Sequence, residues 1–327
     1  MGLYLVTGAA GFIGSHLVDA LLGAGHAVRG LDDFSTGRIE NLDPRCQVLR
    51  ADVADPMAVA RAMRGVDGCF HLAAIASVAR TNEDWLGTHR TNQTGTITVL
   101  DAARPRAAPE RSVMPERSVM PERGVVPVVY ASSAAVYGDI GLRLAQEELR
   151  PAPLTAYGAD KLGSELHARA AWLVHGVPTL GLRFFNVYGP RQSPSSPYSG
   201  VISIFSHRIA QGLAVQVHGD GEQLRDFVHV SDVVRHLLAG MALLGAAPGG
   251  EVMNVATGRG TSLRGLIAVL RDLHGMDPAV LHEPARRGDI RRSVGDPTLA
   301  RALLGVSATV GLMAGLATLA GRQSAAA

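Results

Sequence analysis

Short apolar runs alternate with amphipathic stretches through the first half of the chain. The runs are nearly continuous, as in strands buried on both faces of a parallel sheet. They cover Leu3–Val6, Ala27–Leu31, Gln47–Leu49, Gly68–Leu72 and Val125–Tyr130. Between them, helical spacing covers Phe12–Leu22, Pro56–Met63 and Thr88–Ala103. Repeated strand–helix units predict right-handed crossovers, and hence an α/β fold with a doubly wound, Rossmann-like parallel sheet.

The second half is more irregular, with prolines that mark loops between helical patterns. The sheet is expected to continue to about Phe184, which predicts a Rossmann-like domain over residues 1–184. Residues 185–327 are expected to form mainly a smaller C-terminal α/β lobe, with some segments returning to the first domain. Helices are expected at Ala156–Val174, Val201–Gln211, Asp232–Leu244 and Leu263–Leu273.

A short repeat interrupts the first domain. The hexapeptide PERSVM occurs at Pro109–Met114 and again at Pro115–Met120, and a third copy begins at Pro121. Two copies and a fragment are too few for a solenoid. Because the segment is rich in proline and charge, residues 109–124 are predicted to form an exposed inserted loop.

Composition narrows the function classes. The 31 basic and 29 acidic residues nearly balance, which argues against an electrostatic nucleic-acid binder. The two cysteines cannot form a disulfide framework, so a cytoplasmic protein is expected. The histidines and cysteines show no ligand spacing, and no metal site is expected.

One uncharged stretch is long enough to span a bilayer. It lies between Arg301 and Arg322. Its glycines and hydroxyl residues favour two short helices, Pro297–Leu304 and Val310–Ala320, joined at Gly305. We therefore expect no membrane association.

A glycine-rich motif, TGAAGFIG, joins the first predicted strand to the first predicted helix. In this context Gly8 allows a tight turn, Gly11 lets the backbone approach a pyrophosphate, and Gly14 lets the helix pack closely on the sheet. Asp32 ends the next strand, where a carboxylate binds ribose hydroxyls and would repel a 2′-phosphate. The motif predicts a dinucleotide site with NAD favoured over NADP.

A second group of residues indicates hydride chemistry. Tyr157 and Lys161 share one face of a predicted helix, at spacing i, i+4. Lys161 is the only lysine in a chain that otherwise uses arginine, which suggests that a compact ammonium is needed here. Ser133 follows the fifth predicted strand, where open α/β sheets bind ligands. The ammonium is expected to lower the Tyr157 pKa from about 10, so that the phenol becomes a base for oxidising a carbinol.

These motifs together resemble the extended short-chain dehydrogenases/reductases, and among them the nucleotide-sugar epimerases similar to UDP-glucose 4-epimerase. The resemblance extends over nearly the whole chain, through TGAAGFIG, ASSAAVYG, YGADK, LRFFNVYGPRQ, GDGEQLRDFVHV and ARRGDIRRSVGD. The PERSVM insertion and an Ala/Gly-rich C-terminus depart from the family pattern. The insertion adjoins a helix that this family uses for dimerisation, and a homodimer is expected.

The resemblance implies which residues bind the cofactor and which bind the substrate, a UDP-sugar. The cofactor residues would be Gly8, Gly11, Phe12, Ile13, Gly14, Asp32, Asp33, Phe34, Ser35, Thr36, Gly37, Asp52, Val53, Leu72, Ala73, Ala74, Asn92, Tyr157, Lys161 and Phe184. The substrate residues would be Ser133, Tyr157, Asn186, Val201, Gln216, His218, Arg225, Arg286, Asp289 and Ser293. Among these, Arg225 and Arg286 would bind the diphosphate, while Gln216 and His218 would reach uracil.

The implied reaction is C4 epimerisation through a transient 4-keto sugar. Tyr157 would take the proton of the 4-hydroxyl while NAD takes the C4 hydride, and Ser133 would hydrogen-bond the reacting oxygen. The keto sugar would then rotate and accept hydride on its other face. Ser293 stands where a bulky tyrosine is associated with restriction to UDP-glucose and UDP-galactose. The small serine predicts that UDP-GlcNAc and UDP-GalNAc are accepted as well.

Two other functions remain open. A nucleotide-sugar dehydratase or decarboxylase would share the fold and the first oxidation step. Dehydratases resembling this family place acidic groups soon after the strand-five serine or threonine, where this chain has Ala134 and Ala135. A non-catalytic NAD-binding regulatory protein could retain the glycine loop, but would not need Ser133, Tyr157 and Lys161 together.

Overall fold

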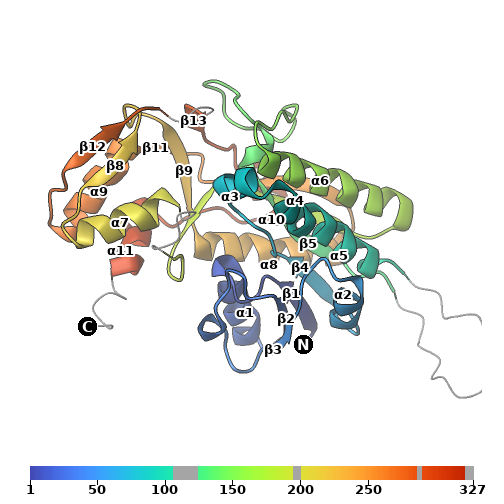
Figure 1. Ribbon diagram of the computed structural model, residues 1–327. Helices are drawn as coiled ribbons and strands as arrows, with labels where there is room; N and C mark the ends of the chain where they lie inside the picture. Colours follow the sequence, from blue (N-terminus) through green and yellow to red (C-terminus); the bar gives the residue numbers. More distant parts are fainter. Residues whose placement is uncertain (106–123, 194–199, 286–288, 321–327) are drawn as a thin grey trace, which may run out of the picture.

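A computed structural model of the chain describes residues 1–105, 124–193, 200–285 and 289–320. Seven parallel strands form one sheet in the order β10-β6-β5-β4-β1-β2-β3 (Figure 1). The doubly wound parallel sheet predicted from the sequence is therefore confirmed. Its strands are β1 (Leu3–Thr7), β2 (Ala27–Asp32), β3 (Gln47–Arg50), β4 (Gly68–His71), β5 (Val128–Ser133), β6 (Thr179–Phe184) and β10 (Gly250–Val255).

Helices cover both faces of this sheet because alternate strand residues point to opposite sides. In β5, Val129 joins a core cluster that contains residues of α1 (Phe12–Gly23) and α8 (Val230–Ala246). Its neighbours Val128 and Tyr130 join a second cluster, with residues of α2, α5 and α6. The helices of the two layers are α1 (Phe12–Gly23), α8 (Val230–Ala246) and α10 (Thr298–Leu304) on one face, and α2 (Pro56–Ala62), α5 (Gly95–Ala103) and α6 (Ala156–His175) on the other.

Two elements differ from the sequence prediction. The fifth strand begins at Val128 rather than Val125, directly after Pro127, which has no N–H for the sheet. The helix expected over Thr88–Ala103 is interrupted by a π-helical turn. The observed elements are α3 (Val78–Glu83), α4 (Trp85–His89), the π-helix η2 (Arg90–Thr94) and α5.

The second half also builds two small sheets that the sequence analysis did not predict. They surround a third core, which includes Phe205, Val217 and Leu266. Most of their strands have only two to four residues and are partly exposed, so they carry little hydrophobic periodicity. The elements are β7 (Asn186–Tyr188), β8 (Val215–His218), β9 (Leu224–His229), β11 (Gly260–Ser262), β12 (Val280–Glu283), β13 (Arg292–Ser293), α7 (Val201–Ala210), α9 (Leu263–His274) and α11 (Leu312–Ala320), with short 3-10 turns η1 (Ile39–Asn41) and η3 (Ala134–Val136) in the first half.

Two separate short helices, α10 and α11, cover the C-terminal region where two were expected, and α10 ends within the uncharged stretch that begins after Arg301. Across the described ranges, no helix has the length and apolar character needed to cross a membrane. The prediction for the PERSVM insertion lies outside the described residues, apart from Gly124.

Candidate active site

The glycine-rich motif forms a tight cradle between β1 and α1. Gly8 has a left-handed φ of 68°, and a Cβ there would lie 2.8 Å from the main-chain nitrogen of Ala73. A Cβ on Gly14 would overlap the carbonyl oxygen of Gly8. Gly11 is the N-cap of α1, so the positive end of the helix faces the loop. The cradle therefore fits a pyrophosphate held by main-chain N–H groups.

Asp32 ends β2 beside this loop. The Ala10 N–H donates to its Oδ2 at 2.9 Å, and the Phe34 N–H donates to its Oδ1 at 2.8 Å. Burial raises the pKa of this carboxyl, and the two hydrogen bonds oppose the rise. The turn that follows requires Phe34 to adopt a left-handed φ of 61°. Asp32 thus braces the loop and still borders the adjoining cavity.

This cavity lies at the carboxyl ends of β1 to β4, where a doubly wound sheet binds its ligand. It brings together half of the predicted cofactor residues: Gly8, Asp32, Asp33, Ser35, Thr36, Asp52, Val53, Leu72, Ala73 and Ala74. Leu31, Ala51, Ile75 and Thr91 also line it and were not predicted. The glycine cradle beside a cavity lined by Asp32 and Asp33 fits NAD.

Other predicted cofactor residues lie next to the cavity without lining it. Phe12 and Ile13 form the first turn of α1, and Gly37 packs against Ala10. Both polar groups of Asn92 are engaged: Oδ1 accepts from the Ile75 N–H at 2.8 Å, and Nδ2 donates to the Ile75 carbonyl at 3.3 Å. Asn92 therefore holds the cavity-lining loop, rather than presenting a free amide.

The three candidate catalytic residues meet between β5 and α6. Ser133 is the last residue of β5 and pairs in register with Phe184 at the end of β6. The Tyr157 phenol forms a hydrogen bond with the Ser133 side chain. Lys161 donates from Nζ to the carbonyl oxygen of Ala131 at 2.9 Å, and its Nζ lies 5.9 Å from the centre of the Tyr157 ring.

The sequence places the helix that carries Tyr157 and Lys161 accurately. Thr155 caps α6 by accepting the Gly158 N–H at 3.1 Å. A Cβ on Gly158 would lie 2.6 Å from the Ala135 carbonyl oxygen, so glycine permits this turn of the helix to approach η3. The close approach brings the phenol beside the end of β5.

Burial changes the pKa of both α6 groups. It lowers the pKa of Lys161 to about 8, while the charges of Asp160 and Glu165 oppose the change. Lys161 is thus mainly an ammonium at neutral pH. Burial raises the pKa of Tyr157, and the hydrogen bond to Ser133 opposes this increase. The expected lowering of the Tyr157 pKa is therefore not found in this structure, because desolvation outweighs the favourable interactions.

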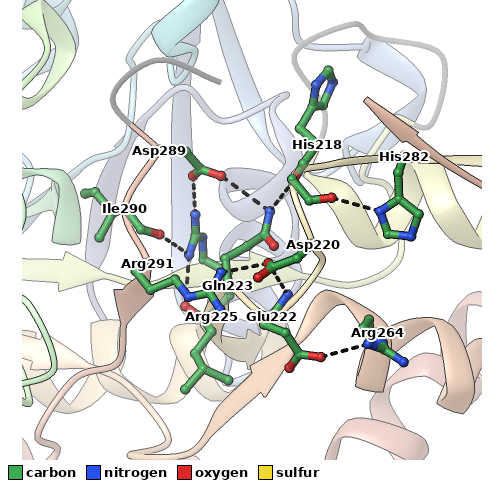
Figure 2. Close-up of polar contacts among 12 residues, drawn as sticks. His218, Asp220, Glu222, Gln223, Arg225, Arg264, His282, Asp289, Ile290 and Arg291 are labelled. Carbon is green, nitrogen blue, oxygen red and sulfur yellow. Dashed lines mark hydrogen bonds and ion pairs between the residues drawn. The ribbon is translucent and has the colours of Figure 1, made fainter. Parts of the chain in front are cut away.

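Six of the predicted substrate residues line a separate cavity of about 330 Å³ in the second half of the chain. Arg225 is one of its lining residues, and Figure 2 shows its polar contacts: Nη2 donates to Asp289 Oδ1 at 2.5 Å and Nη1 donates to the Ile290 carbonyl at 2.7 Å. Burial lowers the pKa of Arg225, and the negative charge of Asp289 opposes this decrease. The predicted residues on this cavity are Asn186, Val201, Gln216, His218, Arg225 and Asp289, and the unpredicted ones are Ile204, Phe205, Arg208, Gln223 and Leu263.

Gln223 is the most informative residue that the sequence analysis missed. Its Nε2 donates to the His218 carbonyl at 2.9 Å and to Asp289 Oδ2 at 3.4 Å, so it joins two predicted substrate residues (Figure 2). The signal was present, since Gln223 belongs to the GDGEQLRDFVHV motif. Arg225 is the one predicted substrate residue within that motif.

Among the other predicted substrate residues, Ser133 and Tyr157 belong to the catalytic group between β5 and α6, and Ser293 does not line this cavity. Ser293 lies in β13, where it pairs in register with Arg225 of β9. Its backbone is therefore adjacent to the cavity wall. Arg286 lies outside the described residues. Within the described part of the chain, no three His, Cys, Asp or Glu side chains cluster as a metal site would require.

Comparison with known proteins identifies the class. Residues 4–256 match the NAD dependent epimerase/dehydratase family. The chain therefore belongs to this family, and NAD is its cofactor. A curated relative, the UDP-glucose 4-epimerase of Mycolicibacterium smegmatis, is 37% identical over 96% of both chains. The resemblance to nucleotide-sugar epimerases of the extended short-chain dehydrogenase/reductase type is confirmed.

Solved structures and other relatives support the same class. The UDP-glucose 4-epimerase of Thermotoga maritima, solved with UDP-glucose, has a TM-score of 0.87 and 33% identity, and covers 99% of both chains. The UDP-N-acetylglucosamine 4-epimerase of Methanobrevibacter ruminantium, solved with UDP-N-acetylmuramic acid, has a TM-score of 0.88 and 28% identity, and covers 99% of this chain and 98% of that one. A dTDP-glucose 4,6-dehydratase of Streptomyces griseus is 35% identical over 96% of this chain and 91% of its own.

Proposed function

We propose that the protein interconverts the C4 epimers of UDP-hexoses, both UDP-glucose/UDP-galactose and UDP-GlcNAc/UDP-GalNAc, through a transient 4-keto sugar. The observation that carries this proposal is the meeting of Ser133, Tyr157 and Lys161 at the carboxyl end of β5. The likeness to 4-epimerases over almost the whole chain supports it.

Each catalytic side chain has a distinct role. NAD, held by the glycine cradle and Asp32, supplies a reversible hydride acceptor for the sugar carbon. The Tyr157 phenolate takes the proton of the 4-hydroxyl and returns it after rotation of the sugar. Ser133 hydrogen-bonds the same oxygen. The Lys161 ammonium lies 5.9 Å from the centre of the Tyr157 ring, where a positive charge favours the phenolate form.

The second cavity suits the nucleotide part of the substrate. Arg225 presents a guanidinium that can form charge-assisted hydrogen bonds with a diphosphate. Gln216 and His218, on β8, are assigned to uracil. Asp289 holds the Arg225 fork and so fixes its direction toward the cavity.

A nucleotide-sugar dehydratase or decarboxylase is the second candidate, because such enzymes occur among the relatives. Elimination from the sugar needs acid–base groups near the atoms beyond C4. The residues after Ser133 are Ala134 and Ala135 in η3, which cannot transfer protons. This difference favours epimerisation.

We also propose that the protein is a cytoplasmic homodimer. The outer faces of α5 and α6 expose apolar side chains, and Leu173 and Val174 are 68% and 72% exposed. A groove between these helices contains Ile97, Leu100 and Ala170 as well. A second copy would cover this surface. The two cysteines of the chain cannot form a disulfide framework, which supports a cytoplasmic location.

Incubation of the purified protein with UDP-glucose, UDP-galactose, UDP-GlcNAc, UDP-GalNAc and, in a separate sample, UDP-glucuronic acid, followed by NMR of the products, tests the proposal. C4 epimers should form in both pairs with no net change in the cofactor. A 4-keto-6-deoxy sugar would support the dehydratase, and loss of a carboxyl from UDP-glucuronic acid would support the decarboxylase. Bound NAD without turnover of any sugar would support the non-catalytic regulatory protein.

A further inference from the structure

A buried ion pair lies directly behind the candidate catalytic residues. Arg183 of β6 donates from Nε to Glu165 Oε1 at 2.9 Å and from Nη2 to Oε2 at 2.7 Å. The two side chains are only 3% and 6% exposed. A bidentate pair with so little access to water has a fixed geometry.

A third buried residue, Ser132, joins this pair by donating from Oγ to Glu165 Oε1. Ser132 directly precedes Ser133, while Glu165 lies one helical turn after Lys161 on α6. One carboxylate therefore connects the strand that carries the candidate serine to the helix that carries the candidate tyrosine and lysine.

We propose that Glu165 is a positioning residue for the epimerase reaction, holding β5 through Ser132 against α6 so that Ser133 lies correctly beside Tyr157 and Lys161. This inference rests on the proposed function. It predicts that loss of the Ser132–Glu165 bond lowers kcat more than it changes KM, because small displacements of reacting groups slow the chemical step.

The same carboxylate also acts on the charge of Lys161. The charged and titratable groups around the ammonium are Tyr157, Asp160 and Glu165 of α6, His71 of β4 and, through Glu165, Arg183 of β6. Burial lowers the pKa of His71 to about 3, so this imidazole is neutral. Asp160 and Glu165 raise the pKa of Lys161 against its burial. Neutralising Glu165 would remove one anion and leave the Arg183 cation uncompensated, and both changes disfavour the ammonium.

The network offers a matched control on its other side. Arg183 Nη1 donates to the Tyr137 hydroxyl at 2.9 Å, and that hydroxyl donates to Asn254 Oδ1 at 2.7 Å. Tyr137→Phe removes a buried hydrogen bond from the same arginine but leaves Glu165 and Ser132 in place. A purely structural network would make Tyr137→Phe and Ser132→Ala behave alike.

Because Lys161 is the only lysine, its charge can be measured without assignment. Full-length protein labelled with ¹³Cε-lysine gives one lysine signal, whose pH titration in wild type should have a pKa near 8. In Glu165→Gln the titration should move to lower pH, and in Tyr137→Phe it should not move. An unchanged titration in a folded Glu165→Gln protein would overturn the electrostatic part of the inference, whether or not the protein turns over sugars.

Kinetics test the positioning role. Ser132→Ala should lower kcat for UDP-galactose by roughly 10- to 100-fold with little change in KM, and Ser132→Thr, which keeps the hydroxyl, should recover most of the rate. Equal kcat values for Ser132→Ala and Tyr137→Phe would contradict the positioning role even if Glu165→Gln fails to fold. Absence of turnover in wild type would instead reject the proposed function, and the lysine titration would still decide whether Glu165 controls Lys161.

Discussion

Lys161 donates from Nζ to the carbonyl oxygen of Ala131, 30 positions earlier in the chain, at 2.9 Å. This bond ties α6 to β5 two residues before Ser133. It also fixes the ammonium near the Tyr157 ring. The hydrogen bond between the ammonium and the Ala131 carbonyl leaves little space for a larger cationic group. This lack of space is a physical reason why this position holds a lysine in a chain that otherwise uses arginine.

Lys161→Arg should therefore fail as a conservative change. The guanidinium is planar and larger than the ammonium, and the site is 4% exposed. We expect kcat to fall by at least about tenfold, with folding retained, since misplaced charge at a general base loses much of its effect. Steady-state assays and circular dichroism check this. Full activity of the arginine variant would show that the lone lysine is incidental.

Tyr157→Phe should retain folding and NAD binding but lose epimerisation. The change removes only the oxygen that transfers the proton, and loss of a general base costs about 10²–10⁴-fold. Turnover of UDP-galactose and the bound NAD content should be measured together. Near-wild-type turnover would reject the assignment of Tyr157.

Ser293→Tyr tests the choice of sugar. The serine pairs with Arg225 in the strand beside the nucleotide cavity. A tyrosine here should selectively lower kcat/KM for UDP-GlcNAc and UDP-GalNAc, because overfilling a packed site costs about 1–3 kcal/mol. Competition assays between the two substrate pairs give the ratio directly. If wild type ignores UDP-GlcNAc, or the variant treats both pairs alike, Ser293 is not the gate.

His71 predicts how stability changes with pH. Its ring is buried and bonded to Thr7 and Thr96, and burial lowers its pKa to about 3. The unfolded chain binds this proton near pH 6.5 and the folded chain does not, so the contribution of His71 to stability falls as pH drops from about 6.5 toward 3.

Between pH 8 and pH 5, the contribution of His71 to the free energy of unfolding should fall by about 2 kcal/mol. Urea unfolding at both pH values should show a correspondingly smaller loss in His71→Gln. Identical pH dependence in wild type and His71→Gln would contradict the neutral buried ring.

Leu173→Glu tests the homodimer. The side chain is 68% exposed on α6, and a carboxylate within an apolar interface is unfavourable. Light scattering should show a dimer for wild type and a monomer for this variant. Leu281→Glu, at a 49% exposed position on β12, should remain dimeric. A monomeric wild type would reject the dimer.

Local rules explain what the sequence by itself determined about this protein. The glycine cradle follows from backbone sterics at Gly8 and Gly14, and the position of these glycines between a predicted strand and a predicted helix identifies it. The shared face of Tyr157 and Lys161 follows from helical geometry. The parallel sheet follows from buried apolar runs, because strands covered on both faces must be apolar throughout. Such features depend on residues near one another in the chain.

Tertiary structure decided what depends on distant pairings. Asp289 meets Arg225 across 64 positions, and Gln223 meets Asp289 across 66, and no local pattern encodes either contact. Asn92 is predicted to line the cofactor channel, and the assembled fold adds that its amide holds the loop at Ile75 through two hydrogen bonds. The direction of the Tyr157 pKa shift was likewise decided by burial, which exists only once α6 has packed against β5. Burial and long-range hydrogen bonds arise only from the assembled fold, and they set the electrostatics of this site.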